Sequence, residues 1–360
     1  MSYSHGYSEN KIKELQMLQI SIDTAESLNI MNKQADCNTK VDTNAKYKYS
    51  LFVIQENLPL FLQPWWLDIA CSQSGLEWDV ILYEKGGHIW GSFVYTYKKK
   101  MGFSIISTPA LTPISGPYIK YPDNQKISKK LSWEKEIMNY FIDNLPKFDK
   151  FVSCFHHSVD NWLPFYWNGF EQTTQYTHVI EDLSNLDSVY SNFDHMARNN
   201  IKKALKKDVK VIDSDDIESF YEVNRITFDK QGVKMSYDLK YIRELYIRAK
   251  KENSVIMKFA IRNNIVYSVM IGVYDKNTLY ILLAGSDRTI QTYGAEYLLF
   301  WEMMKFASEH NLSYDFEGSI IEGIEKRNRS FGAVPKRFFK ITKNNSFALK
   351  TLKYLKGLIK

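Results

Sequence analysis

The stretch SVIMKFAIRNNIVYSVMIGVYDKNTLYILLAGS, residues 254–286, decides the fold of this chain. It holds three apolar runs rich in Val, Ile and Tyr, separated at residues 262–264 and 275–277 by Asn and Asp. Runs of this kind are typical of strands, and Asn and Asp favour tight turns. The stretch therefore predicts a three-stranded antiparallel meander.

Helices are predicted on both sides of the meander. Two periodic segments, residues 216–232 and 236–251, precede it, and AEYLLFWEMMKFASEH (295–310) follows it. The last segment has one apolar face, formed by Ala295, Leu298, Leu299, Met303, Phe306 and Ala307. A short strand (312–318), a helical turn (321–330) and a final strand (337–342) complete this unit.

An earlier unit of the chain shows a similar order of predicted strands and helices. We predict a strand at LFVIQ (51–55), a helix interrupted at Pro64, and two strands joined by Gly86-Gly87, a pair of residues that favours a hairpin. A strand at 102–108, a Pro/Gly-rich loop (109–119), a helix (133–145), and strands at 150–156 and 175–180 follow.

The predicted fold class is α/β (α+β), with two units in tandem, each a mixed, mostly antiparallel sheet flanked by helices. The predicted boundaries are a mobile leader (1–46), a first unit (47–183), a second unit (184–345) and a basic amphipathic tail helix (346–360).

Composition and charge exclude several classes of protein. With 44% hydrophobic and 24% charged residues, the chain is not disordered in bulk. Cys37, Cys71 and Cys154 lie far apart without a C-x-x-C pair, which argues against a disulfide framework or a thiolate zinc site. The first residues lack the apolar core of a signal peptide, so we expect a cytoplasmic protein.

The basic residues are concentrated in two segments. The net charge is +6, but residues 196–210 carry six Lys/Arg against one Asp, and residues 336–360 carry eight Lys/Arg and no acid. Local basic surfaces of this kind indicate an anionic partner, such as a phosphate-bearing ligand, a nucleic acid or a lipid headgroup.

Three motifs carry a family resemblance: RNNIKKA (198–204), YDFEGS (314–319), and GIEK (323–326) leading to SFGA (330–333). With the order of elements, they resemble the CelD-type branch of GNAT-like acyltransferases, a relative of the Fem-type peptidyltransferases, whose members also carry two GNAT-like units. The resemblance covers roughly residues 50–345. It implies transfer of an acyl or aminoacyl group to an amine without a metal, and it leaves the substrate open.

The donor loop departs from the usual GNAT pattern. A GNAT pyrophosphate loop reads Gln/Arg-x-x-Gly-x-Gly/Ala, whereas this chain has QTYGAE (291–296), which retains Gly294 but ends in Glu296. Backbone N–H groups at a helix start can bind phosphate, but an acid there weakens the case for coenzyme A. Since Fem-type relatives use aminoacyl-tRNA, both acyl-CoA and aminoacyl-tRNA stay open as donors, and no permanently bound cofactor is expected.

Asp315 and Glu317 are the candidate catalytic acids. They lie two apart on a predicted strand, so both side chains should point to the same face. A carboxylate with a raised pKa can take the proton of a substrate ammonium as a general base. The alternative is structural, with one acid capping the next turn or pairing with Arg327 or Arg329.

Other candidates line up with the motifs. Arg198, Lys202 and Lys206 form one helical stripe that can hold donor phosphates; the alternative is a solvated helix face. Tyr293 precedes the long helix, where its phenol could protonate a leaving thiolate, or simply pack. The remaining predicted donor- or substrate-binding residues are Asn199, Gly294, Ser319, Arg327, Ser330 and Phe331.

No metal site is predicted. His156 and His157 are adjacent on a predicted strand, so their side chains should diverge, and with His178 they are interpreted as structural. In the tail, apolar residues alternate with Lys350, Lys353 and Lys356, which suits peripheral contact with an anionic membrane or docking on the chain itself.

The sequence thus predicts a cytoplasmic N-acyltransferase that moves an acyl group from acyl-CoA to a small-molecule or nucleotide-linked amine, in cell-envelope or polysaccharide metabolism. One alternative is an aminoacyl-tRNA-dependent peptidyltransferase that acts on a peptidoglycan precursor. The other is a non-catalytic binding protein on the same fold, for which the altered donor loop is the main support.

Overall fold

The computed structural model describes residues 43–318 and 320–351. A compact unit begins at Ala45. Most of the predicted leader (1–46), Ser319 and the tail beyond residue 351 lie outside the described residues. No helix within the described ranges is long and apolar enough to cross a membrane.

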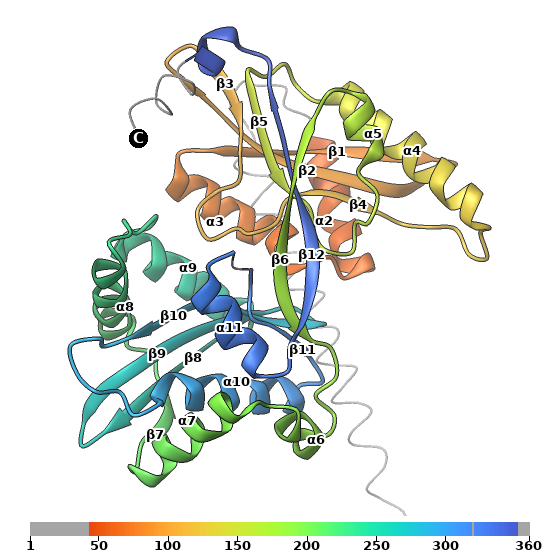
Figure 1. Ribbon diagram of the computed structural model, residues 1–360. Coiled ribbons are helices and arrows are strands. Elements are labelled where there is room, and N and C mark those ends of the chain that lie inside the picture. The colour runs from red at the N-terminus through yellow and green to blue at the C-terminus, as the bar shows by residue number, and fades with distance from the viewer. Residues whose placement is uncertain (1–42, 319, 352–360) are drawn as a thin grey trace, which may run out of the picture. The chain divides into compact units, whose positions relative to one another are not determined.

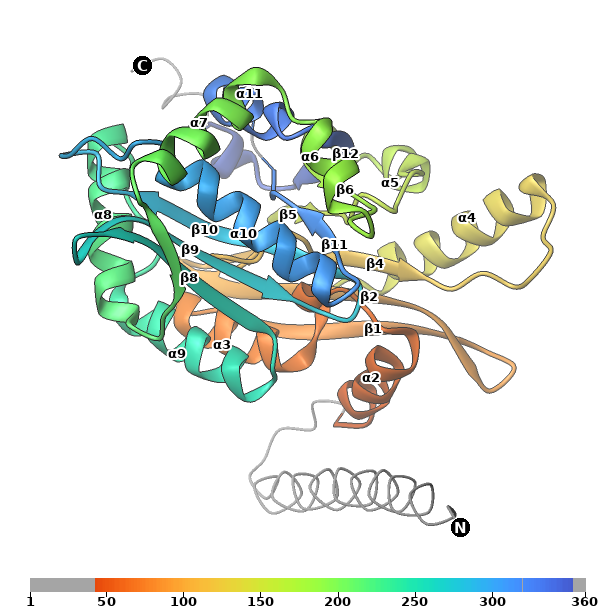
Figure 2. The same ribbon diagram turned by 90° about the horizontal axis from the view of Figure 1, so that it is seen from below.

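A twelve-stranded mixed sheet runs through the described chain (Figures 1 and 2). Its strand order is β1-β2-β3-β5-β12-β6-β11-β10-β9-β8-β7, and β4 pairs with β2 beside this path. Most neighbouring strands are antiparallel, and helices flank the sheet. The predicted α/β (α+β) class is therefore confirmed.

The first half of the chain forms five helical segments and six strands. In chain order these are α2 (Thr43–Glu56), η1 (Leu60–Leu62), α3 (Pro64–Ser74), β1 (Glu77–Lys85), β2 (His88–Lys100), β3 (Phe103–Ile106), β4 (Gly116–Ile119), α4 (Ile127–Asn144), β5 (Lys150–Cys154), α5 (Leu163–Trp167) and β6 (Glu171–Ile180). The hairpin at Gly86-Gly87 and the helix break at Pro64 are confirmed, since Pro64 stands at the start of α3.

Two strand predictions in this half were wrong. LFVIQ, expected as a strand, lies inside α2, where Phe52 and Val53 are buried and Leu51 and Ile54 face solvent. A short apolar run cannot by itself distinguish a strand from a helix. The Pro/Gly-rich loop contains the strand β4, because Gly116 at φ 94° brings the chain against β2.

The second half follows the predicted order. Its elements are α6 (Leu186–Ser191), α7 (His195–Lys206), β7 (Lys210–Asp213), α8 (Ile217–Gln231), α9 (Leu239–Lys251), β8 (Val255–Arg262), β9 (Ile265–Tyr274), β10 (Thr278–Ser286), α10 (Ala295–Glu309), β11 (Ser313–Asp315), α11 (Glu322–Ser330) and β12 (Val334–Asn344). The predicted meander is β8-β9-β10, and both Asn263 and Asn264 have positive φ in its first turn.

Each half contains one parallel strand pair bridged by a long helix. In the first half α4 lies between β3 and β5, and in the second α10 lies between β10 and β11. This repetition is the tandem arrangement that the sequence rhythm predicts. The last strand crosses over, because β12 inserts between β5 and β6 and so completes the sheet of the first half.

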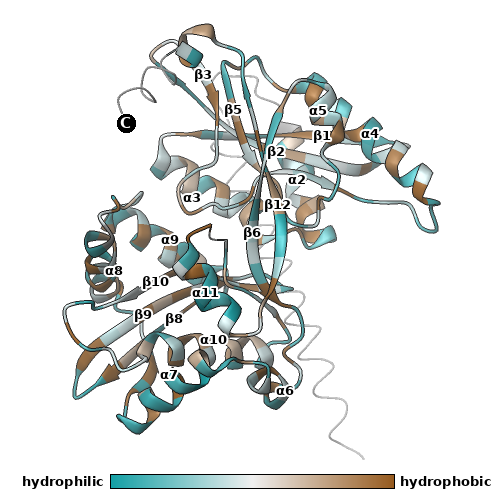
Figure 3. Cartoon of the chain, viewed as in Figure 1, coloured by the Kyte–Doolittle hydropathy of each residue, from teal (hydrophilic) through white to brown (hydrophobic). Residues whose placement is uncertain are grey.

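Two hydrophobic cores cover the two faces of the second half of the sheet. On one face, α7 and α10 pack on Leu279, Ile281 and Tyr314. On the other, α8, α9 and residues of the first half, including Phe61 and Trp66, pack on Tyr280 and its neighbours. Hydrophobic residues run along β8, β9 and β10, whereas α7 is largely hydrophilic (Figure 3).

The strands β10 and β11 separate soon after they begin. They pair in parallel only from Thr278↔Ser313 to Tyr280↔Asp315. Beyond this point β11 ends, and the register of β10 against β9 shifts between Ile281 and Leu283. The later part of β10 therefore has a paired edge toward β9 and an edge toward β11 that no strand occupies.

Candidate active site

Asp315 ends β11 and is buried, with 3% of its surface exposed. Its Oδ1 accepts hydrogen bonds from the hydroxyl of Thr177 and from the backbone N–H of Glu317, the latter at 2.8 Å. Burial raises the pKa of Asp315 to about 6, against the opposing effect of these two donors. Its side chain lies where β10 and β11 part.

Glu317 follows two residues later in a left-handed conformation, with φ at 60°. The predicted strand thus stops earlier than expected, but the two carboxylates still lie together. Burial, and next the nearby charge of Asp315, raise the pKa of Glu317 well above its ordinary value. The pair has the raised pKa that a general base near neutral pH requires.

One half of the structural alternative fits the contacts, because Asp315 caps the next turn by accepting from the Glu317 N–H. The other half, a pairing with Arg327 or Arg329, does not. Arg327 pairs with Glu296 at 2.6 Å, and Arg329 pairs with Glu325 at 3.1 Å. Among the described residues, no Lys, Arg or His nitrogen lies within 4.0 Å of the carboxylate of Asp315 or Glu317. Within the described residues, neither acid is therefore held in an ion pair.

A cavity of about 470 Å³ opens beside Asp315, between the two halves of the chain. The second half contributes Asp275, Tyr280 and Asp315, and the first half contributes Tyr121 and Glu134 among others. A volume of this size suits a small ligand. Glu317 lines a separate hollow of about 290 Å³, together with Leu282 of β10 and the loop around Leu111. The Asp315–Glu317 pair thus lies between two concave sites.

His156 and His157 also line the larger cavity, and the prediction that their side chains diverge was wrong. The strand β5 ends at Cys154, so strand alternation does not apply, and the two imidazole rings lie with centroids 4.1 Å apart. Burial is the main cause that lowers the pKa of both, to about 3 for His156. Both are therefore neutral at pH 7. The described residues contain no group of three or more His, Cys, Asp or Glu suited to a metal ion.

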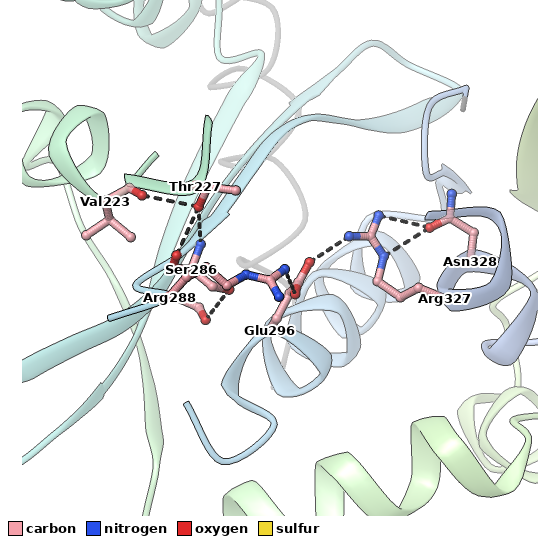
Figure 4. Close-up of polar contacts among 8 residues, drawn as sticks. Val223, Thr227, Ser286, Arg288, Glu296, Arg327 and Asn328 are labelled. Carbon is pink, nitrogen blue, oxygen red and sulfur yellow. Dashed lines mark hydrogen bonds and ion pairs between the residues drawn. The ribbon is translucent and has the colours of Figure 1, made fainter. Parts of the chain in front are cut away.

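Glu296, the unexpected acid of the donor loop, is neutralised by two arginines (Figure 4). Its carboxylate contacts Arg327 at 2.6 Å and Arg288 at 3.8 Å. Arg327 also donates to Oδ1 of Asn328, which is fully buried in α11. Glu296 weakened the sequence-based case for a phosphate ligand. Because both arginines neutralise it, it adds no uncompensated charge at the start of α10.

Basic side chains surround the same loop. The ring of Tyr293 has Lys207 Nζ and the Arg262 guanidinium each 5.6 Å from its centroid. Gly294, at φ 88°, packs against the backbone of Asn200 in α7. The loop thus joins the positive dipole end of α10 to the basic helix α7, a combination that attracts anions.

The remaining predicted residues lie in three different surroundings. Arg198 is half-buried and donates to the Ser191 carbonyl at 3.2 Å, whereas Asn199 and Lys202 are exposed on α7. Ser330 and Phe331 are buried, and Phe331 packs in the core beneath α11. None of these side chains lines the larger cavity. Their roles stay predictions.

Comparisons with known proteins agree with this architecture. Residues 191–322 match the family model of the acetyltransferase (GNAT) domain. The crystal structure of FemX superposes with a TM-score of 0.56 at 15% identity, covering 77% of this chain and 90% of FemX. The carboxyl-terminal domain of a protein assigned as a lysylphosphatidylglycerol synthetase, from Agrobacterium fabrum, gives 0.51 at 9%, covering 88% and 97%. No curated protein matches the chain.

The domain match and the fold define the class of protein as a GNAT-like acyltransferase. Its acetyltransferase (GNAT) domain is residues 191–322, which include α7, the donor loop, α10 and the Asp315–Glu317 pair, and the whole fold is of the kind seen in FemX.

Proposed function

We propose that this chain transfers an acyl group from a thioester of coenzyme A to a substrate amine, with the Asp315–Glu317 pair as the general base. The main supporting observation is that two carboxylates with raised pKa, buried Asp315 and half-buried Glu317, lie where β10 and β11 part, without a cationic partner among the described residues. General bases are tuned in this way by burial and by a like charge.

The reaction needs one proton acceptor and one electrophile. The lone pair of the amine attacks the thioester carbonyl carbon, a C–N bond forms and the C–S bond breaks. The nitrogen then loses its extra proton, which the leaving thiolate takes up. The ammonium of the acceptor must first lose its proton, and the carboxylate of Glu317 or Asp315 receives it. No covalent intermediate with the protein is required.

The free edge of β10 supports an extended donor. From Leu283 to Gly285 this strand pairs with β9 on one side only, so backbone groups face the gap left by β11. At Ser286 the edge is already covered, because its N–H donates to the Thr227 hydroxyl and its C=O accepts from it. An amide-containing chain such as the pantetheine arm can pair with such an edge. The hollow lined by Leu282 and Glu317 lies along it.

The phosphates of the donor would meet the loop before α10. Lys207, Arg262 and Arg288 lie around residues 291–296, and Glu296 is already paired. The same basic surface supports a second candidate, an aminoacyl-tRNA donor, because exposed Lys202, Lys203 and Lys206 continue it along α7.

The test is thermal unfolding of the full chain with saturating acetyl-CoA, longer acyl-CoAs or an aminoacyl-tRNA. A ligand at about 100 times its Kd should stabilise the folded state by about 2.7 kcal/mol. We expect an acyl-CoA shift that weakens in Arg262→Ala and persists in Arg243→Ala, a matched arginine that pairs with Glu218 on α8. A shift with aminoacyl-tRNA alone would favour the second candidate, and no shift with any donor would favour a binding protein.

The role of the base is tested by release of free thiol from acyl-CoA in the presence of an amine. Glu317→Gln should lower kcat by at least about 100-fold, since general-base catalysis typically contributes 10²–10⁴-fold. The matched control is Glu325→Gln, which changes an acid of α11 that pairs with Arg329. This variant should keep the activity of the wild type. Equal rates in Glu317→Gln and wild type would remove Glu317 from the mechanism.

A further inference from the structure

The larger cavity contains three carboxylates that have hydrogen bonds but no counter-cation. They are Glu134 of α4, Asp275 at the start of β10, and Asp315. Within the described part of the chain, no Lys, Arg or His nitrogen lies within 4.0 Å of any of them. Buried charges in proteins are normally paired, because an unpaired buried ion costs several kcal/mol.

Glu134 lines the same cavity as Asp315 but comes from the first half of the chain. It is 6% exposed, accepts from the Tyr121 hydroxyl at 3.0 Å, and accepts from the Asn161 amide at 2.8 Å. These two hydrogen bonds hold the carboxylate of Glu134 in one orientation. A glutamate held in this way by uncharged donors is suited to receive a cation from the cavity.

Asp275 is similarly held by uncharged groups. Its oxygens accept from the backbone N–H of Leu60 at 2.9 Å, of Asn277 at 2.8 Å and of Thr278 at 3.0 Å, and from the Tyr280 hydroxyl at 3.3 Å. Burial raises the pKa of Asp275 in spite of these donors. This carboxylate lies across the Tyr280 side chain from the Asp315–Glu317 pair, whose charges also act on Tyr280.

Among the other described charged residues of the lining, only Lys130 adds a positive charge outside an ion pair, against the three carboxylates. Glu56, Asp160 and Glu181 already pair with Lys120, Arg337 and Lys336, respectively. Lys130 places its Nζ over the Tyr121 ring, 4.5 Å from the centroid, and makes no ion pair within 4.0 Å. His156 and His157 are neutral at pH 7. The lining of the cavity therefore carries a net negative charge.

Tyrosine rings add to this preference. Tyr118, Tyr121 and Tyr280 line the cavity, and aromatic faces attract cations, most strongly when water is excluded. Lys130 over Tyr121 is one such contact within the chain. Carboxylates from both halves of the chain and tyrosines thus line one cavity, and this lining suits a molecule that carries more than one positive charge.

We propose that this cavity binds the acceptor, and that the acceptor is a diamine or polyamine. One amino group lies at Asp315, the member of the acid pair that lines this cavity, and a second, as ammonium, is held by Glu134. The identification of the cavity as the acceptor site rests on the proposed acyl transfer, whereas its preference for a dication follows from its own lining.

The test measures binding to the full chain by calorimetry without any acyl donor. The probes are 1,4-diaminobutane and spermidine, with 1-aminobutane as the monoamine of matched length. We expect the diamine to bind at least about tenfold more tightly than the monoamine, which corresponds to about 1.4 kcal/mol. Glu134→Gln should remove that difference, and Glu136→Gln, an exposed acid of the same helix paired with Lys85, should keep it.

Tyr121→Phe is a second variant, which removes one donor to Glu134 without changing charge, and it should weaken diamine binding by a smaller factor. Thermal unfolding of each variant shows whether it is folded. Diamine binding without any transfer to it would remove the proposed reaction but leave the dication site intact. Equal affinity for monoamine and diamine in the folded wild type, or binding of Mg²⁺ instead of amines, would overturn the inference.

Discussion

At the scale of single residues, Asp315 and Glu317 are two neighbouring acids placed in different surroundings. Among the residues that the structure describes, Asp315 has two hydrogen-bond donors, Thr177 and the Glu317 backbone, whereas Glu317 has one, the backbone N–H of Gly318. The group with fewer donors and a charged neighbour binds its proton more tightly. Glu317 is therefore the better proton acceptor, and Asp315 sets its pKa.

That coupling predicts a shift in the pH dependence of catalysis. The general base must be ionised, so kcat/KM should fall about tenfold per pH unit below the pKa of the pair. Asp315→Asn removes the charge that raises the pKa of Glu317, so the acid limb of the variant should move to lower pH. The pH profiles of kcat/KM for wild type and Asp315→Asn measure this, and a limb that stays in place would show that the pair is not coupled.

The same burial predicts a pH-dependent stability. The pKa of Asp315 is raised from 3.8 to about 6, so only well below pH 3.8 are folded and unfolded chains both protonated at this group. As pH rises through about 6 the unfolded chain ionises first, and the free energy of unfolding falls by roughly 3 kcal/mol from this residue. Asp315→Asn should lose less stability than wild type between pH 4 and pH 7 in urea denaturation. Parallel slopes for the two proteins would contradict the raised pKa.

At the scale of elements, the contact between α7 and the start of α10 depends on a glycine. Gly294 has φ at 88°, and a Cβ there would clash with the backbone carbonyl of Asn200. Gly294→Ala should destabilise the fold by about 1–3 kcal/mol, because it combines backbone strain with a clash. Gly323→Ala in α11 meets open space and should instead stabilise by about 0.5–1 kcal/mol. Urea denaturation of both variants shows whether Gly294→Ala lowers the free energy of unfolding and Gly323→Ala raises it.

The helices α10 and α11 are joined by the ion pair of Glu296 and Arg327. Both side chains are less than one-fifth exposed, at 18% and 19%. Pairs in contact typically couple by 0.5–3 kcal/mol, and limited exposure favours the upper half of that range. A double-mutant cycle with Glu296→Gln and Arg327→Met should therefore give a coupling of about 1–2 kcal/mol. A coupling near zero would mean that the two helices are held by packing alone.

Elements with a clear period could be predicted from the sequence, and those fixed by distant contacts could not. The meander of residues 254–286 and the helix Ala295–Glu309 follow from local pattern. The strand β4 exists only because it pairs with β2, and nothing in PALTPISGPYI requires it. Asp315 and Glu317 were identifiable from their motif.

The sequence did not point to the other two acids of the proposed acceptor cavity, for the same reason. In the sequence, Asp275 has the character of a turn residue and Glu134 that of an acid on a helix surface. The fold brings both residues to one cavity, although they lie 141 positions apart in the sequence. A buried acid within an amphipathic helix is the one local signal, because Glu134 lies in step with the apolar residues Ile137, Met138 and Phe141. Such an acid indicates a ligand or a buried hydrogen bond.

At the scale of the whole molecule, the two halves of the chain are interlocked by β12. This strand comes from the end of the chain and pairs with β5 and β6, so the first half cannot complete its sheet without it. In return, Leu60, Phe61, Trp65 and Trp66 of the first half pack into the core under the second. The predicted boundary at residues 183–184 therefore divides two repeats of one pattern. Residues from both sides of this boundary nevertheless pack into the same core.

We therefore expect the chain to unfold in one cooperative transition. Seven of the eight tryptophans precede residue 184, so tryptophan fluorescence reports mainly on the first half, while far-UV circular dichroism reports on the whole. Because β12 and the shared core couple the halves, urea curves from the two probes should coincide. Truncation before Val334 should destabilise the first half, which shifts the fluorescence midpoint to lower urea, whereas removal of residues 352–360 alone is the control. Two separate transitions in wild type would show that each half folds without the exchanged strand.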